Sequence, residues 1–193
     1  GDDFALGSLL NLQNFWEADL AAGLRRRREA QAAFARAGYR ERVLLMDSNM
    51  AVSYSGLGLR ERAWRLYGQV AQQQRALQAE GSLLTTLSNM AGTAVDLGRL
   101  AEAQRLLDEA EALQARVQSP GFGALRADVR AALALAEGHP AVAVRGVRAQ
   151  LARLDAHSPM GSRLGVLTTL ARALLARGQP RAALRQTTAA TTL

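Results

Sequence analysis

The sequence contains no cysteine, no lysine and no isoleucine, and aromatic residues make up only 5% of its 193 residues. Without cysteine, neither a disulfide framework nor a thiolate metal site can form. No apolar run approaches the roughly 18 residues that span a bilayer, so we expect no membrane insertion of this segment. The chain is dominated by Ala, Leu and Arg, which are good helix formers, so its composition predicts an all-α protein.

Positive charge is carried by arginine alone and is unevenly placed along the chain, whose net charge is +7. From Gly1 to Glu111 there are 13 Arg against 14 acidic residues, whereas from Ala112 to Leu193 there are 11 Arg against 3 acidic residues. Such an excess attracts an acidic protein surface or a phosphate backbone. The alternative is a codon bias of a GC-rich bacterial genome, and the composition leaves both interpretations open.

A four-residue stretch, Ser-Asn-Met-Ala, occurs at 48–51 and again at 88–91. The forty-residue offset continues through four copies at small residues: Ala51, Ala91, Ala131 and Ala171, then Gly58, Gly98, Gly138 and Gly178, then Ala63, Ala103, Ala143 and Ala183. The alanines suit close contacts between helices, and the glycines suit left-handed helix C-caps. Pro140 and Pro180 each follow such a glycine by two residues, where proline fits the first turn of a helix. The repeating unit is therefore predicted to be helix, short turn, helix.

Apolar residues around these anchors recur at helical spacing and resemble the tetratricopeptide repeat (TPR), whose signature is W-x2-L-G-x2-Y followed by A-x3-F. One copy reads Asp47-x2-Met50-Ala51-x2-Tyr54 and then Ala63-x3-Tyr67. The signature Trp is missing, and the third copy has Arg130 at an apolar position. The forty-residue period is similar to that of kinesin light chains and of many bacterial signalling and transcriptional regulators, in which an Asn often stands two residues before the first Ala, as Asn49 and Asn89 do.

This resemblance implies a right-handed α-solenoid of about five antiparallel helix pairs, forming a single domain over 1–193. The expected repeats are approximately 4–38, 40–79, 81–117, 121–156 and 160–193. The turn of the first repeat is expected near Gly23, because Ala30-x3-Phe34 reads as a second helix. The chain starts without Met and stops inside a helical pattern, so we expect it to be a segment of a larger multidomain protein.

The resemblance further implies that the first helices of the repeats line a concave surface that binds a peptide or protein. The residues expected in this groove are Ser48, Asn49, Val52, Ser88, Asn89, Asp128, Thr169, Arg172 and Trp16. An alternative for Asn49 and Asn89 is that they hydrogen-bond a neighbouring helix or face water. Because later copies carry Val129 and Thr169 instead, we favour ligand contact for the asparagines over a role in stacking.

Motifs for other functions are weak. The run Arg25–Arg28 spreads over more than one helix face, and Glu17, Asp19 and Glu29 are near, so a solvated helix start with local ion pairs is expected. The two histidines, His139 and His157, fall in predicted turns without metal-ligand spacing, and no nucleophile motif or phosphate loop is present. We therefore expect no catalysis, cofactor or metal in this segment.

The sequence thus predicts a non-catalytic, cytoplasmic TPR module that binds a protein or peptide, as the sensory or interaction segment of a bacterial regulatory protein. A second hypothesis is a scaffold that self-associates, forming a homodimer. A third is nucleic-acid binding through the C-terminal arginines, which lacks support from interleaved aromatic residues or from a recognition helix.

Overall fold

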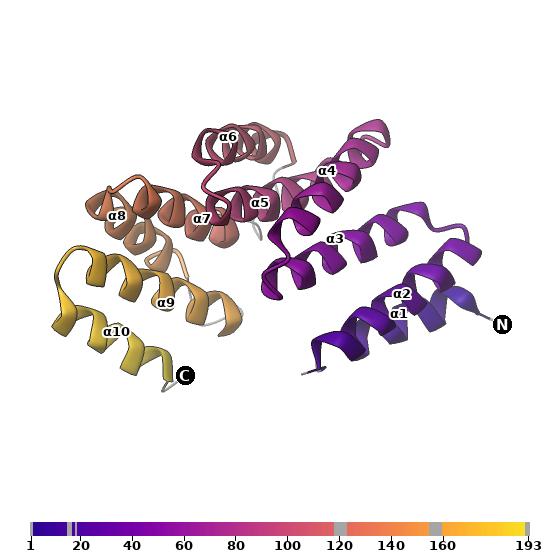
Figure 1. Cartoon of the computed structure of the whole chain (residues 1–193), viewed down its shortest axis with the longest axis horizontal. Coiled ribbons are helices and arrows are strands. Elements are labelled where there is room, and N and C mark those ends of the chain that lie inside the picture. The colour runs from indigo at the N-terminus through magenta and orange to yellow at the C-terminus, as the bar shows by residue number, and fades with distance from the viewer. Residues whose placement is uncertain (1, 15–16, 18, 118–122, 155–159, 192–193) are drawn as a thin grey trace. The chain divides into compact units, whose positions relative to one another are not determined.

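A computed structural model of the chain describes residues 2–14, 17, 19–117, 123–154 and 160–191, and these residues form ten α-helices and no strand (Figure 1). The helices are α1 (Asp3–Gln13), α2 (Leu20–Arg36), α3 (Arg40–Gly56), α4 (Arg60–Ala76), α5 (Glu80–Asp96), α6 (Leu100–Val117), α7 (Gly123–Ala136), α8 (Pro140–Leu151), α9 (Met160–Ala176) and α10 (Pro180–Thr191). The predicted all-α class and the five helix pairs are confirmed.

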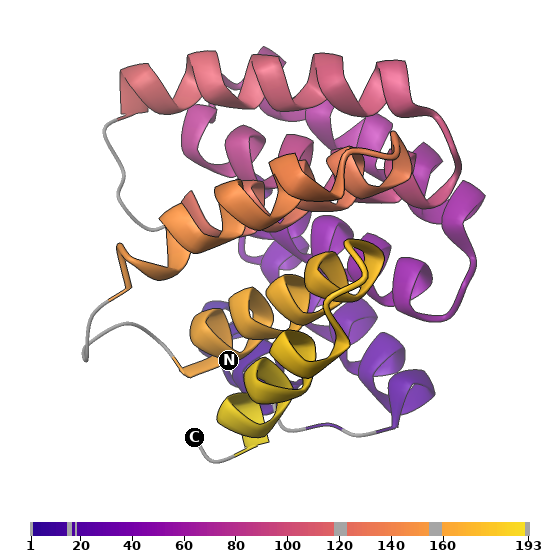
Figure 2. The same cartoon turned by 90° about the vertical axis from the view of Figure 1, so that its left-hand side faces the viewer.

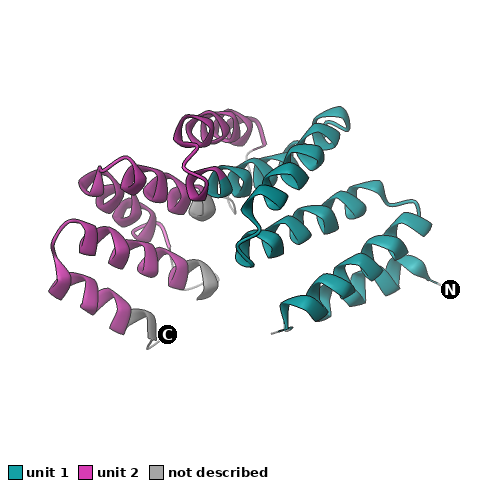
Figure 3. Ribbon diagram, viewed as in Figure 1, with its two compact units in different colours: residues 1–93 teal, residues 94–193 magenta. Residues whose placement is uncertain are grey.

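The chain divides into two compact units, unit 1 over Gly1–Thr93 and unit 2 over Ala94–Leu193 (Figure 3). Within unit 1, α1 packs on α2, α2 on α3, and α3 on α4. Within unit 2, α7 contacts α6, α8 and α9, and α9 pairs with α10 (Figure 2). The first helices α3, α7 and α9 therefore pack both on their partner and on a helix of a neighbouring repeat.

The turns between helices depend on residues in the left-handed backbone region. Gly58, Gly98, Gly138 and Gly178 have φ values between +72° and +78°, so the glycines of the forty-residue series have the conformation that only glycine adopts without strain. The turn after α4 has Gln78 at φ +54° instead. The backbone of Gln78 therefore lies in the same left-handed region as the turn glycines, where a residue with a Cβ atom is strained.

The first turn lies earlier than the sequence predicts. α1 ends at Gln13 and α2 begins at Leu20, with the carboxylate of Asp19 accepting hydrogen bonds from the N–H groups of Ala21 and Ala22 as an N-cap. Gly23 is therefore inside α2 and buried. A Cβ atom at Gly23 would lie 2.9 Å from the side-chain amide of Asn14, so close packing rather than a turn accounts for this glycine.

The two units fill their cores with different side chains. In unit 1, Met50, Tyr54 and Tyr67 are buried around Ala51 and Ala63. In unit 2, the core is built mainly from Val144, Val147, Val166, Leu170 and Leu174 with several alanines. The alanines of the repeat series are at most 3% exposed in both units, which confirms them as packing positions.

Candidate functional site

The concave surface lined by the first helices was predicted to bind a ligand, and α3 and α5 carry the Ser-Asn pairs of that prediction. Ser48 is 5% exposed, and its hydroxyl lies 3.5 Å from the hydroxyl of Thr86 on α5. Ser88 is 1% exposed and donates to the carbonyl oxygen of Leu84 at 2.8 Å. The prediction that these two serines line an open surface is therefore wrong, because both are packed inside the fold.

Asn49 and Asn89 are each half-buried, one residue after a buried serine. For both side-chain amides, the part of the chain that the structure describes offers no recorded hydrogen-bond partner, although their backbone carbonyls accept from Ser53 and Thr93. Val52, one turn after Asn49, is 45% exposed. Since the Ser48–Thr86 contact holds α3 beside α5, these helices present two free amides and an apolar side chain.

In unit 2 the same repeat positions are turned differently. Val129 and Thr169, which correspond to Asn49 and Asn89, are only 8% and 9% exposed. Thr169 was predicted to line the groove, and its burial contradicts this. A buried position disfavours an amide without partners, so the loss of asparagine in the later repeats follows from burial and is no evidence about ligand binding.

Asp128 and Arg172 are the remaining predicted groove residues of unit 2. Asp128 is half-buried and accepts a hydrogen bond from Thr169, but its Oδ1 atom is buried without a recorded partner within the described residues. Burial raises the pKa of this carboxyl, and the hydrogen bond from Thr169 lowers the pKa by less. Arg172 is exposed. The two side chains therefore differ: Asp128 is largely held inside, and Arg172 is free to meet a ligand.

Several other predicted features can be placed, and some cannot. Trp16 and His157 lie outside the described residues. His139 is exposed in the turn before Pro140, which is the first residue of α8. Across the described part of the chain, no three His, Asp or Glu residues are grouped as metal ligands, and no helix is long and apolar enough to cross a membrane.

The arginine run at the start of α2 is more engaged than the sequence predicts. Arg26 forms the expected local ion pair with Glu17. Arg27, however, reaches across to α3 and donates to the hydroxyl of Ser53 at 2.7 Å, and burial lowers the pKa of its guanidinium. Arg28 lies 3.5 Å from the hydroxyl of Tyr54. Arg27 and Arg28 therefore contact side chains of α3, and this part of the run is not simply solvated.

One cleft that sequence reasoning missed lies in unit 1 among α2, α3 and α4, with a volume of about 680 Å³. Met50, Tyr54 and Leu66 occupy its base. The guanidinium of Arg62 lies 4.3 Å from the centre of the Tyr54 ring, which is a cation–π contact. Asp47 accepts a hydrogen bond from Gln31 at 2.7 Å, and burial raises the pKa of its carboxyl.

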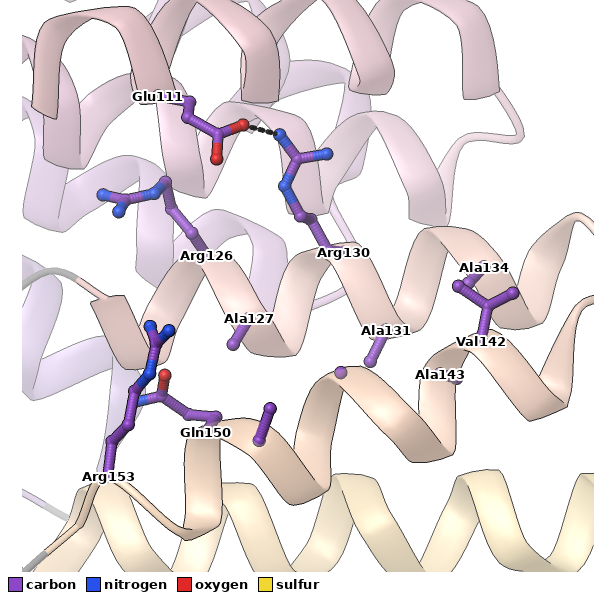
Figure 4. A pocket seen from close by; sticks show the side chains of 12 residues that line it. Glu111, Arg126, Ala127, Arg130, Ala131, Ala134, Val142, Ala143, Gln150 and Arg153 are labelled. Carbon is purple, nitrogen blue, oxygen red and sulfur yellow. Dashed lines mark hydrogen bonds and ion pairs between the residues drawn. The ribbon is translucent and has the colours of Figure 1, made fainter. Parts of the chain in front are cut away.

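A second cleft lies at the equivalent place in unit 2, among α6, α7 and α8, with a volume of about 310 Å³ (Figure 4). Its floor is made of small side chains: Ala127, Ala131, Ala134, Ala143, Gly146 and Ala149. Arg126 and Arg130 project from α7, Gln150 projects from the last turn of α8, and Arg153 follows that helix by two residues, as Figure 4 shows. Glu111 of α6 forms an ion pair with Arg130, which also pairs with Asp108 at 3.3 Å.

The position of Arg130 explains the mismatch in the third copy of the sequence signature. Its apolar stem borders the cleft, and its charged end reaches the acidic residues of α6, so the arginine is accommodated without a buried charge. The sequence signal near this cleft was Arg130 at an expected apolar position, and it indicates a cleft only once the three helices are placed together.

The arrangement of helices is shared with solved structures. The chain is similar to two crystal structures from Podosopora anserina, assigned to a kinesin light chain with nearly identical TPR-like repeats, the second being a single-substitution variant. Both are 24% identical, and the match covers 97% of this chain and 92% of theirs, with TM-scores of 0.61 and 0.63. No protein-family model matches the chain, and neither does any curated protein. The likeness confirms a TPR-like helical-repeat fold.

Proposed function

We propose that the chain is a non-catalytic binding module that holds an extended peptide or protein segment against the outward faces of α3 and α5. The observation that carries the proposal is the pair of half-buried amides, Asn49 and Asn89, on adjacent first helices with no recorded hydrogen-bond partner among the described residues. A carboxamide both donates and accepts, so two in series match the alternating N–H and C=O groups of a peptide backbone. Val52, which is exposed on α3 one turn after Asn49, supplies an apolar contact.

The wider role follows by analogy with TPR-like proteins. We infer a cytoplasmic interaction or sensory segment of a bacterial regulatory protein, attached to a signalling or transcription output domain. Arg172 and Asp128, on first helices of unit 2, and Trp16, which lies outside the described residues, stay predicted ligand contacts, and the proposed site on α3 and α5 does not depend on them. Ser48, Ser88 and Thr169 do not, because they are buried.

The test is a peptide-library binding screen with the wild-type chain, followed by affinity measurements with the double variant Asn49→Ala and Asn89→Ala. Two lost hydrogen bonds of about 0.5–1.5 kcal/mol each predict roughly a 5- to 150-fold loss of affinity. The matched control is Gln72→Ala with Gln73→Ala, which removes two exposed amides from α4. Unchanged affinity in the asparagine variant, or equal loss in the control, contradicts the proposal.

Self-association is a second candidate, favoured by exposed leucines at both ends of the chain. Leu6, Leu9 and Leu12 are exposed on α1, and Leu164, Leu175 and Leu184 on α9 and α10. Exposed apolar side chains that gather on a helix face favour association between protein surfaces. Light scattering distinguishes the candidates. The scaffold is favoured by a tight dimer that is lost in the double variant Leu175→Glu and Leu184→Glu. It also requires that the double variant Asn49→Ala and Asn89→Ala has no effect on peptide binding.

A further inference from the structure

The unit 1 cleft among α2, α3 and α4 gathers more positive charge than the surrounding sequence supplies. Its lining includes Arg28 from α2 and Arg62 and Arg65 from α4, against a single acidic residue, Asp47 of α3. From Gly1 to Glu111 the chain has 13 Arg against 14 acidic residues, so this part of the sequence is close to neutral. The positive charge of the cleft therefore reflects how the helices place these side chains, and not the composition of the segment.

Two of the arginines converge on the ring of Tyr54. The guanidinium of Arg62 lies 4.3 Å from the ring centre, and Nη2 of Arg28 lies 3.5 Å from the hydroxyl oxygen. Arg65 follows Arg62 by three residues on the same face of α4. Within the described part of the chain, no ion pair with a carboxylate is recorded for any of the three. Like charges held this close repel one another, so an anion between them is favoured.

Asp47 compensates this charge only in part. Its carboxylate accepts a hydrogen bond from Gln31 at 2.7 Å, and burial raises the pKa of the carboxyl, which disfavours its charged form. Even with Asp47 ionised, three arginines against one aspartate leave the lining with a net charge of +2. A phosphate monoester carries a charge of about −1.5 to −2 at pH 7, which complements this lining.

The charge at Arg62 is particular to this cleft. At the equivalent repeat positions, each forty residues further on, the chain has Glu102, Val142 and Ala182. Glu102 lies 3.9 Å from Arg99 of the preceding turn, so the equivalent position of α6 serves a local ion pair of opposite polarity. Neither the repeat pattern nor helix pairing requires an arginine at position 62.

We propose that the unit 1 cleft binds a small phosphorylated metabolite, a phosphate monoester whose organic part contains an apolar or aromatic ring. Arg28, Arg62 and Arg65 donate hydrogen bonds to the phosphate, since a guanidinium matches phosphate oxygens in a planar, bidentate geometry. The ring packs on Met50 and Leu66 at the base of the cleft. The volume of about 680 Å³ is within the range of pockets that hold a whole small molecule.

This site is separate from the proposed peptide site on α3 and α5. Asp47, Met50 and Tyr54 are spaced by three and four residues and therefore share one face of α3. Asn49 and Val52 fall on the opposite face at 100° per residue. The double variant Asn49→Ala and Asn89→Ala should therefore leave phosphate-ester binding unchanged, so the failure of one site is distinguishable from the failure of the other.

The probe is phenyl phosphate, and its binding to the full chain is measured by isothermal titration calorimetry in a phosphate-free buffer. Inorganic phosphate lacks the ring, and phenol lacks the charge. Phenyl phosphate is expected to bind at least about tenfold more tightly than either, because only this probe engages the arginines and the apolar base together.

The first variant, Arg62→Gln with Arg65→Gln, removes two phosphate contacts. Both side chains are exposed, so the variant is expected to fold, and thermal unfolding without ligand checks this. Affinity for phenyl phosphate should fall at least about tenfold, because charge-assisted hydrogen bonds are lost. The matched control is Arg105→Gln with Arg145→Gln, which removes two exposed arginines at the repeat position of Arg65 and leaves affinity unchanged.

The second variant, Asp47→Asn, should have the opposite effect. Its amide oxygen still accepts the hydrogen bond from Gln31, while the negative charge beside the phosphate is removed. Affinity for phenyl phosphate should rise by about two- to fivefold. A merely structural role of Asp47 would not tighten ligand binding.

The proposal is overturned if phenyl phosphate does not bind, if phenol or inorganic phosphate binds equally well, or if the Arg62 and Arg65 variant keeps its affinity. An equal loss in the Arg105 and Arg145 control, or weaker binding in Asp47→Asn, also contradicts it. A single-stranded oligonucleotide that binds through Arg62 and Arg65 when phenyl phosphate does not would assign the charge to a nucleic-acid backbone instead. Binding of phenyl phosphate that is lost in the Arg62 and Arg65 variant and kept in the control supports the proposal.

Discussion

Units 1 and 2 share the same forty-residue repeat but have side chains of different size at equivalent positions between their helices. Where unit 1 places Met50, Tyr54 and Leu66 between its helices, unit 2 has Arg130, Ala134 and Gly146 at the equivalent positions. The shared alanines and turn glycines preserve the helix pairs in both. The difference teaches that the small anchors fix the backbone, whereas the larger positions are free to become either core or binding surface.

The units also differ at the position that follows the packed serines. Asn49 and Asn89 are half-buried in unit 1, whereas Val129 and Thr169 are buried in unit 2. The polar contact between the first helices of neighbouring repeats differs as well. In unit 1 the Ser48 hydroxyl contacts the Thr86 hydroxyl, and in unit 2 the Asp128 carboxylate accepts a hydrogen bond from Thr169. Equivalence in the repeat therefore does not guarantee the same exposure.

The most direct way to break the contrast is to truncate a large buried side chain of unit 1. Tyr54→Ala converts unit 1 to the composition of unit 2 at this position. Tyr54 is 6% exposed and carries the contact with Arg62, so the cavity should lower the free energy of unfolding by about 3 kcal/mol. Urea denaturation measures the loss, and hydrogen exchange should place it in α3 and α4. Tyr54→Phe, which keeps the ring, is the control, and a loss below about 1 kcal/mol in Tyr54→Ala contradicts the packing role.

The turns offer a second contrast, since the turn after α4 has Gln78 at φ +54°, whereas the turn after α9 has Gly178 at φ +75°. Gly178→Ala should destabilise the chain by about 1–2 kcal/mol, because alanine is strained at φ +75°. Gln78→Gly should stabilise it by about 0.5–1 kcal/mol, because glycine relieves the strain at φ +54°. Thermal unfolding of both variants checks the opposite signs. Shifts of the same sign would disprove the backbone explanation.

The two units are also expected to differ in how their stability depends on pH, because unit 2 has Asp128 where unit 1 has the neutral Ser48. Burial raises the pKa of the Asp128 carboxyl, so the folded state favours the protonated acid. The resulting penalty is absent below the unfolded pKa near 3.9 and grows as the pH rises through the folded-state pKa. Asp128→Asn should therefore stabilise the chain at neutral pH, by less than about 1 kcal/mol after solvent screening, and flatten this part of the pH profile. Urea midpoints of both proteins measured between pH 4 and pH 8 test this. The prediction is contradicted if the wild type gains stability relative to Asp128→Asn as the pH rises.

The smallest expected effect is at Arg130. Arg130→Met restores the residue type of unit 1, and the ion pairs lost are partly exposed. Such pairs contribute about 0–1 kcal/mol, so stability should change by about 0.5 kcal/mol or less. Denaturation at low and high salt checks it. A loss above about 2 kcal/mol would mean that the ion pairs to α6 are needed to hold α7 in place.

The sequence predicted the fold well because the features that specify it are local and repeated. Ala51, Gly58 and Ala63 recur at a fixed offset, and each has one physical requirement, a close contact or a left-handed backbone. The prediction was wrong for the first repeat. Gly23 lies inside α2 in close contact with Asn14, and it does not form a turn. A glycine alone does not reveal which of these two requirements it meets.

The candidate sites divide along the same line. The sequence by itself determined the helix pairs, the turns and the recurrence of Asn49 and Asn89, because periodicity and backbone conformation are properties of neighbouring residues. Only the tertiary structure decided that Ser48, Ser88 and Thr169 are buried, and that Arg126, Arg130 and Arg153 surround a hollow. Exposure and cavities depend on how side chains from different helices meet, and the spacing within one helix contains no information about the side chains that face it from another.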